Sequence, residues 1–288
     1  MNPLLWPLAL IFAMTSPQSE QRRIVEHIVS TQKAIQNSAP ESNPLFVAFW
    51  DFDGTILNGD CSEGFKRDGE LIYKGMAQVA IEAGLSELYQ ADGGFEKFWT
   101  DYRYMEHNIS EWIAYPFIPQ MLRGAKEHEV RALARRQFEE VYQKHYFKES
   151  VKMFQALDGA GIHNYIISAS ADVFVEAAAP TLNLAKDRCH GIKLQSDEGI
   201  LTERLIYPVT WSHGKTEKLQ AIVAELQSRH PKRKVYILAG FGNSYGTDGP
   251  FLKYIAEQKL PHGKPLSVMI NGGETPSGYA NKFKQINL

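Results

Sequence analysis

The chain has 288 residues, of which 44% are hydrophobic and 22% are charged, a composition that excludes a largely disordered protein. With 31 Lys and Arg against 33 Asp and Glu it has no basic field to attract nucleic acid, and we expect no nucleic-acid partner. Its two cysteines, Cys61 and Cys189, form no disulfide framework and lack the close His or Cys partners of a zinc site. Any partner must therefore be recognised at a local site.

Residues 1–18 resemble a signal peptide. Leu4 to Met14 is nearly all apolar, is followed by small and polar residues, and is too short to span a bilayer as a helix. No Lys or Arg precedes it. We expect a periplasmic or secreted protein, the alternative being a cytoplasmic protein whose N-terminal helix packs on the domain. No later segment approaches a membrane span, so we expect no stable membrane insertion.

Residues 19–44 are expected to form a helix and a linker. Apolar residues recur at helical spacing from Ile24 to Ile35, and the stretch from Asn37 to Pro44 contains the Ser, Pro and Asn that end helices.

Four short apolar runs then follow, the pattern of parallel strands buried on both faces. They cover Leu45–Trp50, Tyr165–Ile167, Val235–Ala239 and Ser267–Ile270. Helical segments lie between them, at Val173–Ala179 and Thr216–Ser228. Strands that alternate with helices predict an α/β fold, a Rossmann-like doubly wound parallel sheet.

Residues 61–151 separate the first two of these strands and are too long for a loop. Apolar residues there repeat at helical spacing and no strand is evident, so we predict a helical insertion in a core made of residues 45–60 and 152–288. From Cys189 to Trp211 two apolar stretches flank the turn Asp197-Glu198-Gly199, which predicts a β-hairpin.

The residues that carry chemistry follow the strands, where ligands bind in open α/β sheets. The first run ends in Asp51-Phe52-Asp53-Gly54-Thr55, in which two carboxylates can hold a hard cation and leave one oxygen free for attack. The alternatives are a polar turn or part of a calcium loop.

Three weaker signals follow the later strands. Ser168-Ala169-Ser170 offers hydroxyls and amides to a phosphoryl oxygen, although such a sequence is also a common turn or helix cap. Lys215 opens a helix, where its ammonium can neutralise phosphate charge unless it is simply solvated. The glycine-rich loop 240–248 carries oxygen ligands suited to magnesium, or is a flexible turn.

Taken in order, these four elements resemble the haloacid dehalogenase superfamily, over residues 45–270. The resemblance implies that Asp51 is the nucleophile, Asp53 the general acid/base, Ser168 the hydroxyl residue of the second motif and Lys215 the lysine of the third. It implies a magnesium ion held by Asp51, the Asp53 carbonyl and Asp248. The family's other acidic position is Asn243 here, which brings no charge, so metal affinity is expected to be reduced.

The second aspartate also favours phosphate-ester hydrolysis over carbon–halogen cleavage. The resemblance implies that Gly54, Thr55 and Ser170 bind the phosphoryl group. The insertion resembles the helical cap of phosphoserine and phosphorylcholine phosphatases, and we call residues 61–151 the cap segment. In that group an acidic residue nine positions after the nucleophile reads the substrate's amine, which gives Asp60, with Glu63 close by. The alternative is a polar linker.

The cap segment is also rich in aromatic residues, which attract cations. They are Phe95, Phe98, Trp99, Tyr102, Tyr104, Trp112, Tyr115 and Phe117. We expect either a cage for an amine or quaternary ammonium or the cap's own hydrophobic core. The leading hypothesis is a magnesium-dependent phosphomonoesterase acting on a small phosphorylated metabolite through an aspartyl-phosphate. The alternatives are a phosphotransferase that uses the same intermediate and a catalytically weak phosphate-binding protein.

Overall fold

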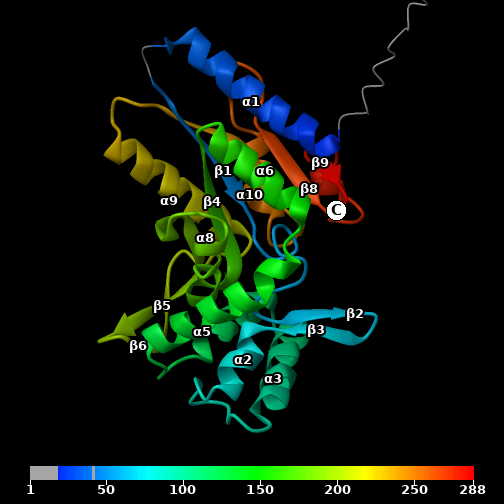
Figure 1. Ribbon diagram of the computed structural model, residues 1–288, viewed down its shortest axis with the longest axis vertical. Helices are drawn as coiled ribbons and strands as arrows, with labels where there is room; N and C mark the ends of the chain where they lie inside the picture. Colours follow the sequence, from blue (N-terminus) through cyan, green and yellow to red (C-terminus); the bar gives the residue numbers. More distant parts are fainter. Residues whose placement is uncertain (1–18, 41–42) are drawn as a thin grey trace, which may run out of the picture.

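The computed structural model of the protein describes residues 19–40 and 43–288. A sheet-based core and a mainly helical part lie at opposite ends of the long axis (Figure 1). The predicted signal peptide lies outside the described residues. Across the two described ranges, no helix combines the length and the apolar character that crossing a membrane requires.

The core is built on a seven-stranded sheet with the order β6-β5-β4-β1-β7-β8-β9. All neighbouring strands are parallel except β5 and β6, which are antiparallel. The strands are β1 Leu45–Trp50, β4 Ile162–Ala171, β5 Cys189–Asp197, β6 Ile200–Ile206, β7 Val235–Gly242, β8 Leu266–Ile270 and β9 Lys284–Ile286. The predicted doubly wound α/β fold is confirmed, and the four apolar runs are β1, β4, β7 and β8.

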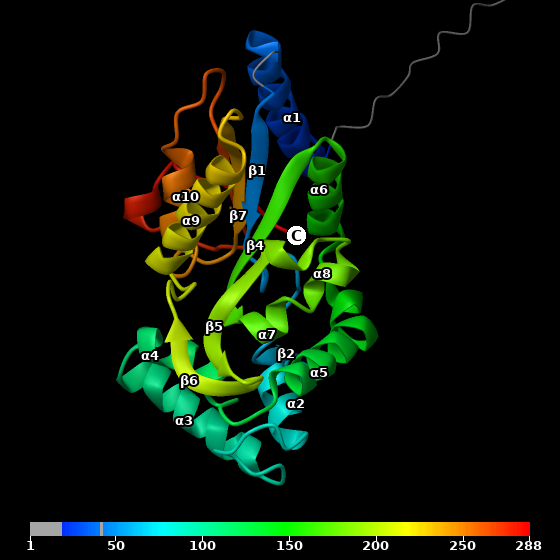
Figure 2. The same ribbon diagram turned by 90° about the vertical axis from the view of Figure 1, so that its left-hand side faces the viewer.

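Strand β1 is buried on both faces because helices cover both sides of the sheet (Figure 2). These four helices are α1 Glu20–Ser38, α6 Lys148–Gly159, α9 His213–Arg229 and α10 Gly249–Ala256. Phe46 and Trp50 belong to the core beneath α1 and α6, whereas Val47 and Phe49 belong to a second core beneath α9 and α10. The continuous apolar run follows from this burial on both faces.

The helix predicted near the N-terminus is α1. Ser19 precedes it, and its hydroxyl accepts a hydrogen bond from the Arg22 backbone at 3.4 Å. Ile24, Ile28 and Ile35 recur at helical spacing and are buried.

The cap segment is mainly helical, but it begins with a β-hairpin that the sequence analysis did not predict. Strands β2 Gly64–Arg67 and β3 Glu70–Lys74 pair through Asp68 and Gly69, whose φ angles of 52° and 85° suit a two-residue hairpin turn. The expectation of no strand between 61 and 151 was wrong, because these strands are largely exposed and charged and lack an apolar alternation. The segment's boundaries stay a prediction.

The remaining helices of the cap segment follow this hairpin. They are α2 Met76–Glu82, α3 Gly94–Asn108, α4 Glu111–Gln120, α5 Glu127–Glu140 and the 3₁₀ helix Tyr142–His145. Two shorter 3₁₀ helices, Lys186–Arg188 and Ser277–Tyr279, lie in the core.

Two further predictions concern the core. The hairpin predicted between Cys189 and Trp211 is formed by β5 and β6, with Glu198 and Gly199 at its turn. The helix predicted over Val173–Ala179 is instead divided into α7 Asp172–Val175 and α8 Ala178–Thr181. Pro180 explains the break, because proline cannot donate the helical hydrogen bond to the Glu176 carbonyl and its ring crowds that group.

Candidate active site

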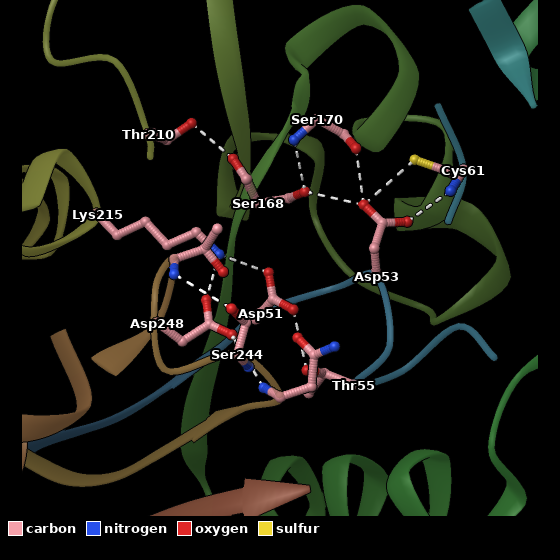
Figure 3. Close-up of polar contacts among 12 residues, drawn as sticks. Asp51, Asp53, Thr55, Cys61, Ser168, Ser170, Thr210, Lys215, Ser244 and Asp248 are labelled. Carbon is pink, nitrogen blue, oxygen red and sulfur yellow. Dashed lines mark hydrogen bonds and ion pairs between the residues drawn. The ribbon is translucent and has the colours of Figure 1, made fainter. Parts of the chain in front are cut away.

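A small cavity of about 110 Å³ lies at the carboxyl ends of β1, β4 and β7. It is the edge at which open α/β sheets bind their ligands. The cavity is lined by Asp51, Asp53, Asp60, Ser62, Glu63, Tyr115, Ile118, Ser168, Ala169, Ser170, Lys215, Asn243, Ser244 and Thr247. The fold thus brings together most of the predicted site residues from four separated stretches of the chain (Figure 3).

Lys215 bridges two of the predicted carboxylates. Its Nζ lies 2.6 Å from Asp51 Oδ1 and 2.6 Å from Asp248 Oδ1, and the Lys215 and Asp248 side chains are 1% and 0% exposed (Figure 3). Burial acts to lower the pKa of Lys215, but Asp248 and Asp51 raise it to about 12. The ammonium therefore stays charged and is fixed beside Asp51.

Thr55 orients the second carboxylate oxygen of Asp51. Thr55 Oγ1 donates to Asp51 Oδ2 at 3.0 Å, and Thr55 is fully buried. Burial and then the charge of Asp248 raise the pKa of Asp51, Lys215 opposes both, and the net result is a pKa of about 7. Lys215 and Thr55 thus hold the Asp51 carboxylate in a poorly hydrated site. A cation near its negative charge would stabilise it there.

Asp53 lies in a cradle of donors. Ser170 Oγ and Ser168 Oγ donate to Asp53 Oδ2 at 2.7 and 3.2 Å, and the Cys61 backbone N–H donates to Oδ1 at 2.7 Å. The Cys61 Sγ lies 3.6 Å from Oδ2 (Figure 3). Burial, and then the charges of Asp60 and Asp51, raise the pKa of Asp53 well above its usual value. A raised pKa suits a carboxyl that has to carry a proton.

Asn243 reaches the first motif. A Cβ at Gly54 would lie only 2.0 Å from Asn243 Nδ2, and Gly54 has a φ of 71°, so no other residue fits at position 54 without strain. The backbone N–H groups of Asn243 and Ser244 donate to Asp248 Oδ2 at 2.9 and 3.0 Å, which fixes the glycine-rich loop. Asp248 thereby has both oxygens engaged, one by Lys215 and one by this loop.

The donors around the cavity fit a magnesium ion in their chemistry. Mg²⁺ takes oxygen ligands and is typically held by one or two carboxylates, with water and substrate phosphate completing the shell. Asp51 and Asn243, which carry a carboxylate and an amide oxygen, both line the cavity. Over residues 19–40 and 43–288, no group of three His, Cys, Asp or Glu side chains is arranged to hold a metal by itself. Backbone, water and substrate oxygens would therefore have to complete the shell.

Gly54 and Thr55 were predicted to face the substrate, but neither lines the cavity. The Gly54 N–H donates to the Leu57 and Gly59 carbonyls at 2.8 and 3.0 Å, and the Thr55 hydroxyl is taken by Asp51. Their place is behind the nucleophile. Sequence reasoning missed Cys61, Ser62 and Thr210, whose Oγ1 donates to the Ser168 carbonyl at 2.6 Å. No motif marks these residues.

Asp60 and Glu63 do reach the cavity. Asp60 Oδ1 accepts from the Ser62 and Glu63 amides, both at 2.7 Å, and Glu63 Oε1 accepts from Tyr102 Oη at 2.6 Å. Burial, followed by the charge of Asp60, raises the pKa of Glu63 to about 7. Burial also raises the pKa of Asp60. Two partly desolvated acids thus line the cavity beside the paired aspartates.

The aromatic residues of the cap segment serve mainly as its core. Phe98 stacks on Tyr102, Phe95 and Phe117 at ring separations of 6.0, 6.2 and 5.9 Å. Of the eight residues predicted as a possible cage, Tyr115 alone lines the cavity. It also packs on Trp211 of the core at 6.1 Å.

A larger cavity of about 450 Å³ lies elsewhere, between the β5–β6 hairpin and α9. Its lining residues include His190, Lys193 and Lys218. It has no lining residue in common with the small cavity. We place the chemistry in the smaller cavity, because the paired carboxylates and the buried lysine are there.

The doubly wound sheet and the acidic cavity at its carboxyl edge define an α/β protein with a candidate catalytic site. The chain belongs to the haloacid dehalogenase-like hydrolase family, whose model matches residues 48–253. The resemblance inferred from the motifs is thus confirmed. No curated protein sequence matches the chain.

Solved structures resemble it at low sequence identity. A protein of unknown function from Bordetella pertussis Tohama I matches with a TM-score of 0.62 and 15% identity, over 85% of this chain and 99% of that one. A family hydrolase from Salmonella enterica serovar Typhi matches with a TM-score of 0.52 and 14% identity, over 90% and 75%. Cytosolic 5'-nucleotidase IIIB, solved with cytidine, matches with a TM-score of 0.53 and 17% identity, over 88% and 78%. At such low identities, these TM-scores show a shared fold alone.

Proposed function

We propose that the protein is a magnesium-dependent phosphomonoesterase that works through a phosphorylated Asp51. One observation carries the proposal: two aspartates two positions apart line the same small cavity, and the first is bonded to a buried lysine. A carboxylate nucleophile needs a neighbouring acid and a cation that screens the incoming phosphate. Asp53 supplies the acid and Lys215 the cation.

In the first half-reaction, an Asp51 oxygen attacks phosphorus while the bond from phosphorus to the ester oxygen breaks. Asp53, protonated at the start, gives its proton to the departing oxygen, which leaves as an alcohol. Lys215 stabilises the charge on the transferring phosphoryl group, and the Ser168 hydroxyl, whose 3.2 Å contact with Asp53 is the longer of the two serine contacts, would turn to it while Ser170 keeps its bond to Asp53. Thr55 holds the attacking carboxylate.

In the second half-reaction, water attacks the phosphorus of the aspartyl-phosphate and gives a proton to the Asp53 carboxylate. The bond from phosphorus to the Asp51 oxygen breaks, which releases inorganic phosphate and restores both aspartates. Asp51, the Asp53 carbonyl and Asn243 would hold the magnesium ion, which would screen the approach of the anionic phosphate to the anionic carboxylate. Asp248 stays a proposed fourth ligand, because its oxygens, like those of Asp51, can bind a cation in addition to the hydrogen bonds that they accept.

The proposed substrate is a small phosphoester whose leaving group carries an amine or quaternary ammonium. A cavity of about 110 Å³ leaves little room beyond the phosphate. Asp60 and Glu63 line it with Tyr115, so a cation there would meet two acids and one aromatic face.

The test is hydrolysis of para-nitrophenyl phosphate with and without Mg²⁺ by wild type and by Asp51→Asn and Asp53→Asn. We expect Asp51→Asn to abolish turnover while the circular dichroism spectrum is kept. Asp53→Asn should lose roughly 10²- to 10⁴-fold in rate, the usual contribution of a positioned acid/base. A folded Asp51→Asn protein with near wild-type activity would contradict the mechanism.

The same assay separates the two alternatives. A phosphotransferase would give more alcohol than inorganic phosphate when an acceptor such as glycerol is added. A weak phosphate-binding protein, the alternative that the uncharged Asn243 favours, would bind phosphate without turnover at any magnesium concentration.

A further inference from the structure

We propose that Cys61 and Ser62, where the chain enters the cap segment, are positioning residues for Asp53 and hold it in the orientation that proton transfer requires. The inference rests on the proposed function, in which Asp53 is the proton donor. Neither residue belongs to the motifs from which that function was derived.

Cys61 contacts Asp53 directly, whereas Ser62 reaches it through Ser170. The Cys61 N–H donates to Asp53 Oδ1 at 2.7 Å, and its Sγ lies 3.6 Å from Oδ2, within the reach of a thiol hydrogen bond. The Ser62 hydroxyl donates to Ser170 Oγ at 2.9 Å, and Ser170 Oγ donates onward to Asp53 Oδ2 at 2.7 Å. A direct contact and a relay therefore act on the same carboxyl.

Cys61 and Ser62 are themselves held in place. They are 0% and 1% exposed. Their own carbonyls accept from the first turn of α2, the Cys61 carbonyl from Met76 N at 2.7 Å and the Ser62 carbonyl from Ala77 N at 3.0 Å. The position of the cap helix is thereby transmitted through two residues to the proposed acid.

The carboxyl group of Asp53 can rotate about its side-chain bonds, and only some orientations aim an oxygen at the leaving group. The Cys61 amide fixes one oxygen, whereas the thiol and the serine relay fix the other. Loss of one donor widens the range of orientations without removing the acid. The expected defect is thus in protonation of the leaving group, and not in phosphate binding or attack by Asp51.

Leaving groups of different basicity separate these steps. An alkyl phosphate releases a strongly basic alkoxide that needs a proton, whereas para-nitrophenolate departs with little help. The value of kcat/KM reports the steps up to departure of this group, so the ratio of kcat/KM for the alkyl ester to that for the aryl ester measures acid catalysis in the first half-reaction.

The experiment measures this ratio with phosphoethanolamine or glycerol phosphate against para-nitrophenyl phosphate, in saturating Mg²⁺. For Cys61→Ala and Ser62→Ala we expect the ratio to fall by about 3- to 10-fold, the worth of one modest hydrogen bond. Cys61→Ser should restore most of the ratio because a hydroxyl also donates. A purely structural role would lower both substrates alike and leave the ratio unchanged.

Two buried residues away from Asp53 serve as matched controls. Cys189→Ala removes a 4% exposed thiol in β5, and Ser267→Ala removes a 2% exposed hydroxyl in β8 that donates to the Leu252 carbonyl at 2.7 Å. Both should leave the ratio at its wild-type value, whatever they do to stability.

The outcomes are distinct. An unchanged ratio in folded Cys61→Ala and Ser62→Ala, with an active wild type, overturns the inference and leaves the proposed function standing. If wild type hydrolyses none of these esters, the proposed function fails and the inference falls with it. Should Cys61→Ala not fold, Ser62→Ala decides through the relay.

Discussion

Replacement of Lys215 by methionine is expected to destabilise the protein strongly as well as inactivate it. Lys215 is 0% exposed and lies 2.6 Å from both Asp51 and Asp248, which are 4% and 0% exposed. Methionine keeps the length of the side chain and removes the charge, so two buried carboxylates face each other without compensation. Breaking a buried ion pair in this way costs about 3 to 5 kcal/mol.

For a chain of this size, that loss lowers Tm by roughly 6 to 20 °C, at about 2 to 4 °C per kcal/mol. Circular dichroism melts in EDTA measure it without help from a metal. Addition of Mg²⁺ should recover part of the loss, because a divalent cation can take over the role of the ammonium. Adding Asp248→Asn to the lysine variant should also recover stability, since one carboxylate then remains.

The matched control is Lys282→Met. Lys282 also pairs with a carboxylate, Glu257, at 2.9 Å, but the two side chains are 33% and 54% exposed. Exposed pairs contribute about 1 kcal/mol or less. If Lys215→Met melts in EDTA within about 2 °C of wild type, as Lys282→Met is expected to do, the buried bridge does not exist in solution.

The remaining predictions concern the cavity walls. Asn243→Asp should lower the Mg²⁺ concentration at half-maximal activity, because it adds a negative charge to the metal site; a titration that shows no change or a higher requirement places the amide elsewhere. Asp60→Asn should erase most of any preference for phosphocholine and phosphoethanolamine over glycerol phosphate, and equal kcat/KM for these substrates in wild type would reject the cation pocket. The pKa of Glu63 is raised to about 7 from 4.5, chiefly by burial, so Glu63 stabilises the fold less and less as pH rises from about 4.5 to about 7. Glu63→Gln should therefore gain free energy of unfolding relative to wild type from pH 5 to pH 8, and parallel pH profiles would contradict this.

Much of the fold was predictable because burial on both faces leaves a strong signal. The run from Leu45 to Trp50 has six apolar residues in succession, and all six are buried in β1. The acidic motif directly follows this run, so its place at the edge of the sheet was predictable as well. The hairpin β2–β3 left no such signal, since its strands face solvent and carry Lys66, Arg67 and Glu70.

The site was predictable only where one short motif carried it. Asp51 and Asp53 share a motif, but the contacts that orient them come from remote positions. Thr210 bonds to Ser168 at a sequence separation of 42 positions, and Ser62 bonds to Ser170 at a separation of 108. Such pairs depend on how the chain packs, and isolated serine, threonine and cysteine residues are too common to mark a site. The aromatic residues show the reverse case, because most of a conspicuous cluster packs the cap segment.

The central place of β1 also affects how the chain folds. Its neighbours in the sheet are β4 and β7, and the residue that pairs with Leu45 at its start is Val235. During synthesis, this apolar strand emerges long before either neighbour exists, and its backbone groups and side chains stay unpaired meanwhile. Contacts between residues so far apart in the sequence slow folding, and the intermediates expose apolar surface that makes them prone to aggregate. Fragments that end before β7 should accordingly aggregate, and the segment that presents the nucleophile should be among the last to become protected from hydrogen exchange.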